Sequence, residues 1–265
     1  MSLRSIVRWS ASTTDQIFPP TKGITVLIYH RVGGRSGSAV DLDAAVFNEQ
    51  MSTLAAGGQL LSLHEAVEAL TAGRTCEGVV VTFDDGTADF CEVAVPILQR
   101  HGIPATLYAA THFIDSGEPF PWGAPPTSWP ALRDAVSTGL ISVQSHTHSH
   151  RLLNKAQAPW VADELDRSID AIGSQIGVAP RHFAYPKAVR GNTVAEIAVR
   201  SRFASASLAG SRANQPGNDV HRLWRTPLQR SDTPEMFALK TRGGMRLEGS
   251  ARSAVARVRY RGSQQ

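Results

Sequence analysis

Hydrophobic residues along this chain form short continuous runs, and longer stretches with helical spacing lie between them. Seven runs have the length and composition of buried strands. We expect strands at residues 24–30, 79–83, 105–109, 141–145, 182–185, 203–207 and, as a weaker pattern, near Leu223. The stretches between them repeat apolar residues every three or four positions, most clearly at positions 161, 165, 169, 172 and 176. Strands that alternate with helices are typical of a parallel sheet.

The number of these repeats predicts an α/β fold with one distorted (β/α) barrel of about seven parallel strands. A chain of 265 residues has the size of one such barrel. An open doubly wound sheet is the alternative, but no Gly-x-Gly-x-x-Gly segment follows the first strand to support it. We expect the barrel to span residues 23–240, after an N-terminal extension at 1–22 and before a basic, flexible tail at 241–265.

The charge of the chain is concentrated at its C-terminal end. Residues 241–265 contain six Arg and one Glu, which leaves 21 basic and 22 acidic residues in the rest of the chain. We therefore expect no nucleic-acid binding by the barrel. The tail is either a solvated, flexible end, which we prefer, or a contact for an acidic partner or a membrane surface. The apolar runs are too short to span a bilayer and the N-terminus has no signal-peptide pattern, which predicts a cytoplasmic protein. The two cysteines, Cys76 and Cys91, do not form a metal-type or redox-type pair.

Four of the predicted strands end in ionisable residues. His30 follows the first strand, Asp84 and Asp85 end the second, a His-Thr-His-Ser-His segment at 146–150 follows the fourth, and 181–186 surrounds the fifth. The carboxyl ends of the strands form one face of a (β/α) barrel, and active sites are built on that face. An isolated Asp-Asp-Gly is also a common turn. The three histidines at the same end of another predicted strand favour a functional site instead.

One aspartate and two histidines would supply three ligands to a divalent metal ion. His146 and His150 are four residues apart and can meet on one side of a turn. Three protein ligands leave open positions for water and substrate, which is typical of a catalytic rather than a structural metal site. Zinc suits these ligands best, and cobalt, nickel or iron would accept the same set.

The sequence resembles the polysaccharide deacetylases of carbohydrate esterase family 4. Thr82-Phe-Asp-Asp-Gly86 matches the first motif of that family, His146-Thr-His-Ser-His150 its second, and Arg181-His-Phe-Ala-Tyr-Pro186 its third. The resemblance runs from about residue 24 to about residue 210. It implies a distorted (β/α) barrel and metal-dependent removal of acetyl groups, usually from N-acetylated sugars.

The resemblance also assigns roles by position. It implies that Asp84 is the general base, and that the metal ligands are Asp85, His146 and His150. A base of this kind must stay ionised to accept a proton from water, and a neighbouring cation favours that state.

Two further roles follow from the third motif. The resemblance implies that Arg181 holds Asp84 through a charge-assisted hydrogen bond, and that the backbone N–H of Tyr185 stabilises the oxyanion of the tetrahedral intermediate. Where relatives often have an aromatic residue and glycine after Tyr-Pro, this chain has Lys187-Ala188. Lys187 is therefore a candidate contact for an acidic group of the substrate, or a solvated loop residue.

The last motifs of the family have no clear counterpart in this chain. Its fourth motif has only Asp219 and Trp224 as weak candidates, and its late histidine, taken as the general acid, is missing. Three histidines, His30, His148 and His221, are left as candidate proton donors to the leaving amine.

The segment 115–128 is the longest irregular stretch and a candidate rim of the binding site. We expect Trp122 within it to contact a sugar face, or to anchor the loop, and His30 to line the same site. Our preferred interpretation is a metal-dependent hydrolase that removes an acetyl group from an N-acetylated glycoside, nucleotide sugar or glycan precursor. The alternatives are hydrolysis of another C–N bond or of an O-acetyl ester, or a catalytically silent carbohydrate-binding protein.

Overall fold

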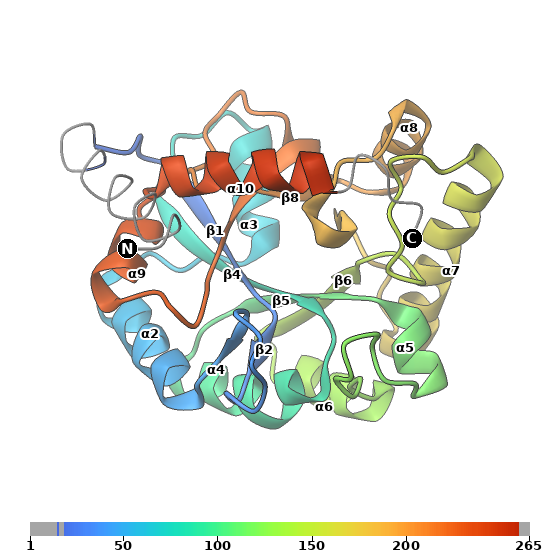
Figure 1. Ribbon diagram of the computed structural model, residues 1–265, viewed down its shortest axis with the longest axis horizontal. Coiled ribbons are helices and arrows are strands. Elements are labelled where there is room, and N and C mark those ends of the chain that lie inside the picture. Colours follow the sequence, from blue (N-terminus) through green and yellow to red (C-terminus); the bar gives the residue numbers. More distant parts are fainter. Residues whose placement is uncertain (1–14, 16–18, 260–265) are drawn as a thin grey trace.

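Seven parallel strands close into a barrel in the computed structural model, which describes Asp15 and residues 19–259 (Figure 1). The prediction of a single distorted (β/α) barrel is confirmed. The strands follow one another around the barrel in chain order, and the last pairs with the first. They are β1 (Ile24–Tyr29), β4 (Gly78–Asp85), β5 (Ala105–Ala109), β6 (Ile141–Ser145), β7 (His182–Ala184), β8 (Ser205–Ala209) and β9 (Leu223–Pro227).

The register of the strands places their polar ends at one mouth of the barrel. Tyr29 pairs with Phe83, so His30, which follows β1, lies level with Asp84 of β4. Asp85 pairs with Ala109 of β5, and Ala109 pairs in turn with Ser145, the residue before His146. Side chains alternate between the two faces of each strand, so neighbouring polar residues at this mouth point in different directions.

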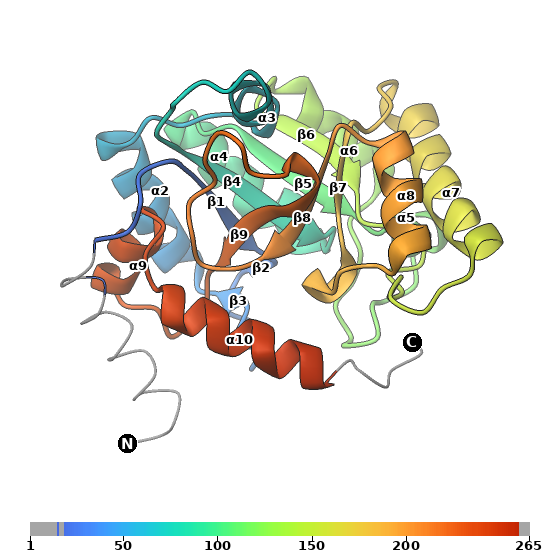
Figure 2. The same ribbon diagram turned by 90° about the horizontal axis from the view of Figure 1, so that it is seen from above.

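Helices cover the outside of the barrel, and two short strands, β2 (Arg31–Val32) and β3 (Asp41–Leu42), form a separate small sheet (Figure 2). One helix, Ala158–Ile176, covers the stretch where the apolar spacing is clearest, and another begins at the Ser62–Glu65 capping box. The described helices are α2 (Ala44–Gly57), α3 (Leu63–Thr71), α4 (Val95–His101), α5 (Thr111–Ser116), α6 (Trp129–Ser137), α7 (Ala158–Ile176), α8 (Thr193–Arg202), α9 (Pro234–Lys240) and α10 (Arg246–Arg259), with shorter turns η1 (Phe90–Ala94), η2 (Pro186–Ala188) and η3 (Val220–Arg222).

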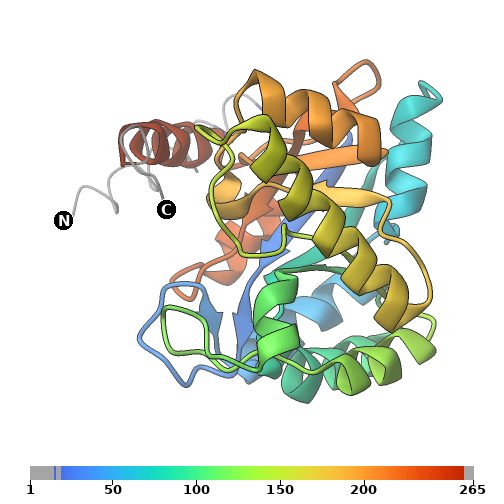
Figure 3. The same cartoon turned by 90° about the vertical axis from the view of Figure 1, so that its right-hand side faces the viewer.

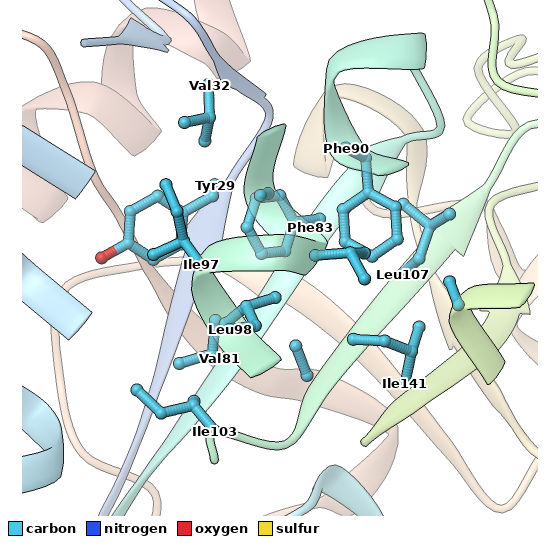
Figure 4. Packing of buried hydrophobic residues seen from close by; sticks show 14 of the residues in the cluster. Tyr29, Val32, Val81, Phe83, Phe90, Ile97, Leu98, Ile103, Leu107 and Ile141 are labelled. Carbon is cyan, nitrogen blue, oxygen red and sulfur yellow. The ribbon is translucent and has the colours of Figure 1, made fainter. Parts of the chain in front are cut away.

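The largest part of the core lies between the outer face of the strands and the helices. The rings of Tyr29, Phe83 and Phe90 pack against one another in this layer (Figure 4). The centre of the Phe83 ring lies 4.9 Å from that of Phe90 and 5.3 Å from that of Tyr29. A second cluster fills the lower barrel interior, where Val26 and Val80 meet residues of α3. The backbone N–H of Leu61 donates to the carbonyl of Val79 near the amino end of β4, and α3 begins two residues later. Helix α3 therefore closes the end of the barrel opposite the polar mouth.

The predicted segments at the two ends of the chain are only partly covered by the described residues. The predicted N-terminal extension at 1–22 lies mostly outside the described residues, as do residues 260–265 of the predicted tail. Within the segment expected to be a flexible tail, Arg246–Arg259 form α10. Among the described residues, no helix is long and apolar enough to cross a membrane.

Candidate active site

A buried ion pair occupies the interior of the barrel just below its polar mouth. Arg225 of β9 donates two hydrogen bonds to Asp84, from Nη1 to Oδ1 at 2.6 Å and from Nη2 to Oδ2 at 2.9 Å. Nη1 also lies 3.2 Å from the Thr82 hydroxyl, and the guanidinium lies 4.8 Å from the centre of the Tyr108 ring. Arg225 is completely buried and Asp84 is 5% exposed, so this fork-to-fork pair is held away from water.

The charges around Asp84 favour its ionised form. Burial alone would raise the pKa of this carboxyl, but the Arg225 guanidinium lowers it below its ordinary value. A buried carboxylate that stays ionised can accept a proton without first losing one. Asp84 therefore has the charge state that a general base needs.

Three ligand-type side chains meet beside this pair. Asp85, His146 and His150 each present one ligand atom, and these atoms lie within 4.8 Å of one another. Asp85 Oδ1 is 3.2 Å from His150 Nε2 and 3.8 Å from His146 Nε2. A single divalent ion fits among one carboxylate oxygen and two imidazole nitrogens arranged in this way.

The protonation states of Asp85 and His146 also suit metal binding. His146 donates from Nδ1 to the carbonyl of Ala184 at 2.8 Å, which leaves the lone pair of Nε2 directed at Asp85. Burial lowers the pKa of His146 to about 4, so its imidazole is neutral at physiological pH. Burial would raise the pKa of Asp85, but the hydrogen bond from His150 lowers it well below its ordinary value.

Strained backbone surrounds these ligands. Asp85, Thr147 and His150 all have positive φ, at 77°, 66° and 58°, although none is glycine. Local hydrogen bonds hold the histidine loop in this shape, because the Thr147 hydroxyl accepts from the backbone N–H of His150 and the carboxylate of Glu164 accepts from that of Ser149. Strain of this kind clusters at functional sites, where the surrounding structure fixes it.

Arg181 does not hold Asp84, and the prediction that it does is wrong. Its exposed guanidinium donates to Nε2 of His64 at 3.2 Å, near the amino end of β7, whereas Asp84 lies at the carboxyl end of β4. Arg225 takes the expected position instead. The sequence did contain a signal for it, since Arg225 is a cation in the middle of the weak strand pattern near Leu223, where an inward position needs a buried partner.

The prediction that the backbone N–H of Tyr185 faces the substrate is also wrong. This N–H donates to the carbonyl of Ser207 at 3.1 Å, because β7 and β8 continue their pairing through this residue. The next two residues, Lys187 and Ala188, have positive φ of 53° and 54°. The turn η2 thus brings the Lys187 position to the carboxyl end of β7, next to the carbonyl that fixes His146.

The three candidate proton donors lie in different places. His30 directly follows β1, at the level of Asp84 on β4, and its Nδ1 is buried without a hydrogen-bond partner among the described residues. His148 points the other way, with Nδ1 2.8 Å from the Thr111 hydroxyl. His221 lies in η3 before β9 and its Nε2 bonds the Phe203 carbonyl, so it belongs to the opposite end of the barrel.

Asp219 and Trp224, the weak candidates for the fourth motif, have partners other than Asp84 and Arg225. Asp219 pairs with Arg200 of α8, and the Trp224 ring stacks under Arg212.

An aromatic column reaches the candidate metal ligands from the 115–128 loop. Phe113, Phe120 and Trp122 stack in series, and the Trp122 ring lies edge-on to His150 at 5.8 Å between ring centres. Trp122 is 46% exposed, while Phe120 beneath it is buried. The predicted rim residue therefore lies beside the candidate metal ligands with one face open to solvent.

Comparison with known proteins gives the family of this chain. The family model described as polysaccharide deacetylase matches residues 72–204, and the chain belongs to this family of carbohydrate deacetylases. A curated relative, a polysaccharide deacetylase of Bacillus subtilis, is 28% identical over 134 residues, which are 49% of this chain and 44% of that protein. The match thus covers less than half the length of that relative.

Solved structures share the fold over most of the chain. IcaB from Ammonifex degensii is 24% identical with a TM-score of 0.74, covering 84% of this chain and 97% of that one. The Streptococcus pyogenes deacetylase PplD, solved in complex with acetate, is 24% identical with a TM-score of 0.75, covering 84% and 99% of the two chains.

Proposed function

We propose that this protein is a metal-dependent hydrolase that removes an acetyl group from an N-acetylated sugar. The observation that carries the proposal is the juxtaposition of a buried, arginine-paired carboxylate with three metal-ligand side chains at one mouth of the barrel. Membership in a family of carbohydrate deacetylases supports acetylated carbohydrate as the substrate class.

Asp85, His146 and His150 would hold the metal ion, and we propose zinc because one carboxylate and two imidazoles suit it. When bound, the ion would polarise the acetyl carbonyl and lower the pKa of a water molecule. The protein side chains fix the ligand set in advance, since His146 is already oriented by the Ala184 carbonyl.

Asp84 is the base in this mechanism. Its carboxylate accepts the proton of the attacking water, and Arg225 holds both oxygens so that the carboxylate keeps its direction as its charge changes. Arg225 also stabilises the ionised form of Asp84, so the base is ready at neutral pH. We place Arg225 as a positioning residue, because it acts through Asp84.

His30 is the proton donor that we propose for the departing amine. It follows β1 at the level of Asp84, and its Nδ1 is buried with no hydrogen-bond partner among the described residues. An amine leaves readily only when its nitrogen gains a proton. Trp122, beside His150, is suited to stack on the sugar ring that carries the acetyl group.

The test is acetate release from N-acetylated glycosides and nucleotide sugars, with the new free amine measured in the same reaction. We expect acetate and amine in equal amounts, and loss of both in Asp84→Asn. Acetate released only from O-acetyl esters would contradict the proposal and favour an esterase on the same scaffold. Absence of turnover together with tight binding of the sugars would favour a carbohydrate-binding protein.

A further inference from the structure

The side chain of Tyr108 crosses the interior of the barrel beside the Arg225–Asp84 ion pair. In the register of the sheet, Tyr108 of β5 is the neighbour of Asp84 on β4, so both side chains point into the barrel. The Tyr108 hydroxyl lies 3.2 Å from the hydroxyl of Ser207 on β8. Strand β8 packs against α8, on the side of the barrel that faces the viewer in Figure 3, and two strands separate it from β5. The ring is therefore fixed at both ends, by its own strand and by Ser207.

The hydrogen bonds of Arg225 hold only one edge of its guanidinium group. Nη1 and Nη2 donate to the two oxygens of Asp84, but Nε is buried and has no hydrogen-bond partner among the described residues. The Cζ atom lies over the Tyr108 ring, 4.8 Å from its centre. An aromatic face attracts a cation, and the attraction is stronger where water is excluded. Both side chains are fully buried, so the Tyr108 ring supplies the support that Nε lacks.

We propose that Tyr108 is a positioning residue for the base: its ring fixes the plane of Arg225, and Arg225 in turn fixes the direction of the Asp84 carboxylate. Two parallel hydrogen bonds to a carboxylate require the guanidinium to stay in the carboxylate plane. A base displaced by about 1 Å from the water that it deprotonates can lose about 10²-fold in rate. The inference rests on the proposed function, because it takes Asp84 as the base.

Packing alone does not explain a tyrosine at this position. Tyr108 also belongs to the apolar cluster of the lower barrel interior, with Val26, Val80 and Leu223. A phenylalanine would fill the same space without a hydroxyl that needs a partner when it is buried. The Ser207 hydroxyl provides this partner and ties the ring to the other side of the barrel. A second polar residue in the interior is explained if the orientation of the ring matters.

Steady-state kinetics of Tyr108→Leu and Tyr108→Phe test the proposal, with acetate release as the assay and metal content measured on the same samples. Tyr108→Leu removes the aromatic face, so we expect kcat to fall by about 10–100-fold while KM and metal content stay at their wild-type values. Tyr108→Phe keeps the face and loses only the bond to Ser207, so it should keep at least about a third of the wild-type kcat. A side chain that only fills the core would change the melting temperature without this selective loss of kcat.

A double-mutant cycle with Arg225→Lys shows whether Tyr108 acts through Arg225. Lysine keeps the charge but has neither the planar face nor the fork, so Arg225→Lys should lower kcat on its own. Adding Tyr108→Leu to Arg225→Lys should then lower kcat by less than about twofold, because the ring has no guanidinium left to hold. If the two losses multiply in the double variant, Tyr108 does not act through Arg225 and the proposal is wrong.

The control for a change in core packing is Phe47→Leu. Phe47 is fully buried on α2, outside the barrel, so this variant should lose stability and keep the wild-type kcat. An unchanged kcat in Tyr108→Leu, or a loss in Tyr108→Phe as large as that in Tyr108→Leu, would overturn the inference. The proposed function fails separately, if the wild type hydrolyses O-acetyl esters but no N-acetylated sugar. The same variants would then test Tyr108 on the ester, because that reaction needs the same base.

Discussion

Arg225 of the last strand holds the carboxylate of Asp84 on β4 by two hydrogen bonds, across a separation of 141 residues in the chain. Both partners are buried, so the pair adds little to the free energy of unfolding compared with apolar side chains in the same place. Breaking the pair, however, is strongly destabilising. Removing one partner leaves the other charge buried without compensation. The pair is therefore sensitive in both stability and chemistry.

Arg225→Met should lower the free energy of unfolding by about 3–5 kcal/mol, because it leaves the Asp84 carboxylate unpaired in the barrel. Arg181→Met is the matched control and should change it by less than about 0.5 kcal/mol, since its guanidinium is exposed. Urea titrations measure both. Equal losses of unfolding free energy in the two variants would show that the Arg225–Asp84 pair does not stabilise the fold as predicted.

Asp84→Asn and Asp85→Asn should fail in different ways. Asp84→Asn removes proton acceptance and leaves the ligands in place, so metal content should be kept while turnover falls by about 10²–10⁴. Asp85→Asn replaces a charged ligand with a neutral one, so metal affinity itself should fall. Elemental analysis of chelator-free protein, with acetate release on the same samples, separates them. Metal loss in Asp84→Asn with retention in Asp85→Asn would exchange the two roles.

His30→Gln tests the proton donor through the leaving group. A good leaving group such as p-nitrophenolate departs without a proton, so hydrolysis of p-nitrophenyl acetate should fall much less than N-deacetylation does. The rates on both substrates, compared with His148→Gln and His221→Gln, give the measurement. If both substrates slow equally in His30→Gln alone, His30 has a role in binding or folding instead.

Trp122→Ala should raise KM by about tenfold, equivalent to ~1.4 kcal/mol of lost contact, with little change in melting temperature. The reason is that Trp122 keeps one face exposed beside His150, whereas Phe120 beneath it is buried. Trp122→Phe keeps an aromatic face and should recover most of the affinity. A large drop in melting temperature with an unchanged KM would show that Trp122 anchors the loop.

His182 should make the protein less stable in mild acid. Burial, with the charges of His64 and Arg181, lowers its pKa to about 4, so the unfolded chain binds a proton between about pH 6.5 and pH 4 that the folded chain does not. The free energy of unfolding should therefore decrease as the pH falls through that window, by up to about 3 kcal/mol. His182→Gln should remove this part of the slope in urea titrations at a series of pH values, and an unchanged slope would contradict it.

The strands and the ligand cluster could be predicted from the sequence because both depend on local patterns. Buried parallel strands have continuous apolar runs, and β5 and β6 have the bounds expected from theirs. The histidines directly follow β6, so the strand itself carries them to the mouth of the barrel. Short elements such as α5 and the π-turn η1 have no periodic pattern long enough to detect.

The partner of Asp84 could not be predicted in the same way, because it depends on which strands close the barrel. Arg181 is near the third motif in sequence, but it lies before β7, at the end of the barrel away from Asp84. Arg225 follows a run too short and too mixed to mark a strand clearly. Pairing of β9 with β1 places Arg225 two strands from β4 around the barrel, and that is a property of the closed sheet rather than of any segment.

Closure of the barrel by its last strand also sets an order of events during synthesis. The candidate metal ligands are all present once residue 150 has been made, but Asp84 meets its counter-charge only after β9 enters between β8 and β1. Before that, the Asp84 carboxylate has water as the partner for its charge. Pairing of β9 with β8 and β1 supplies Arg225 and completes the ion pair, so a chain that ends before Leu223 contains every candidate ligand but lacks the partner of Asp84.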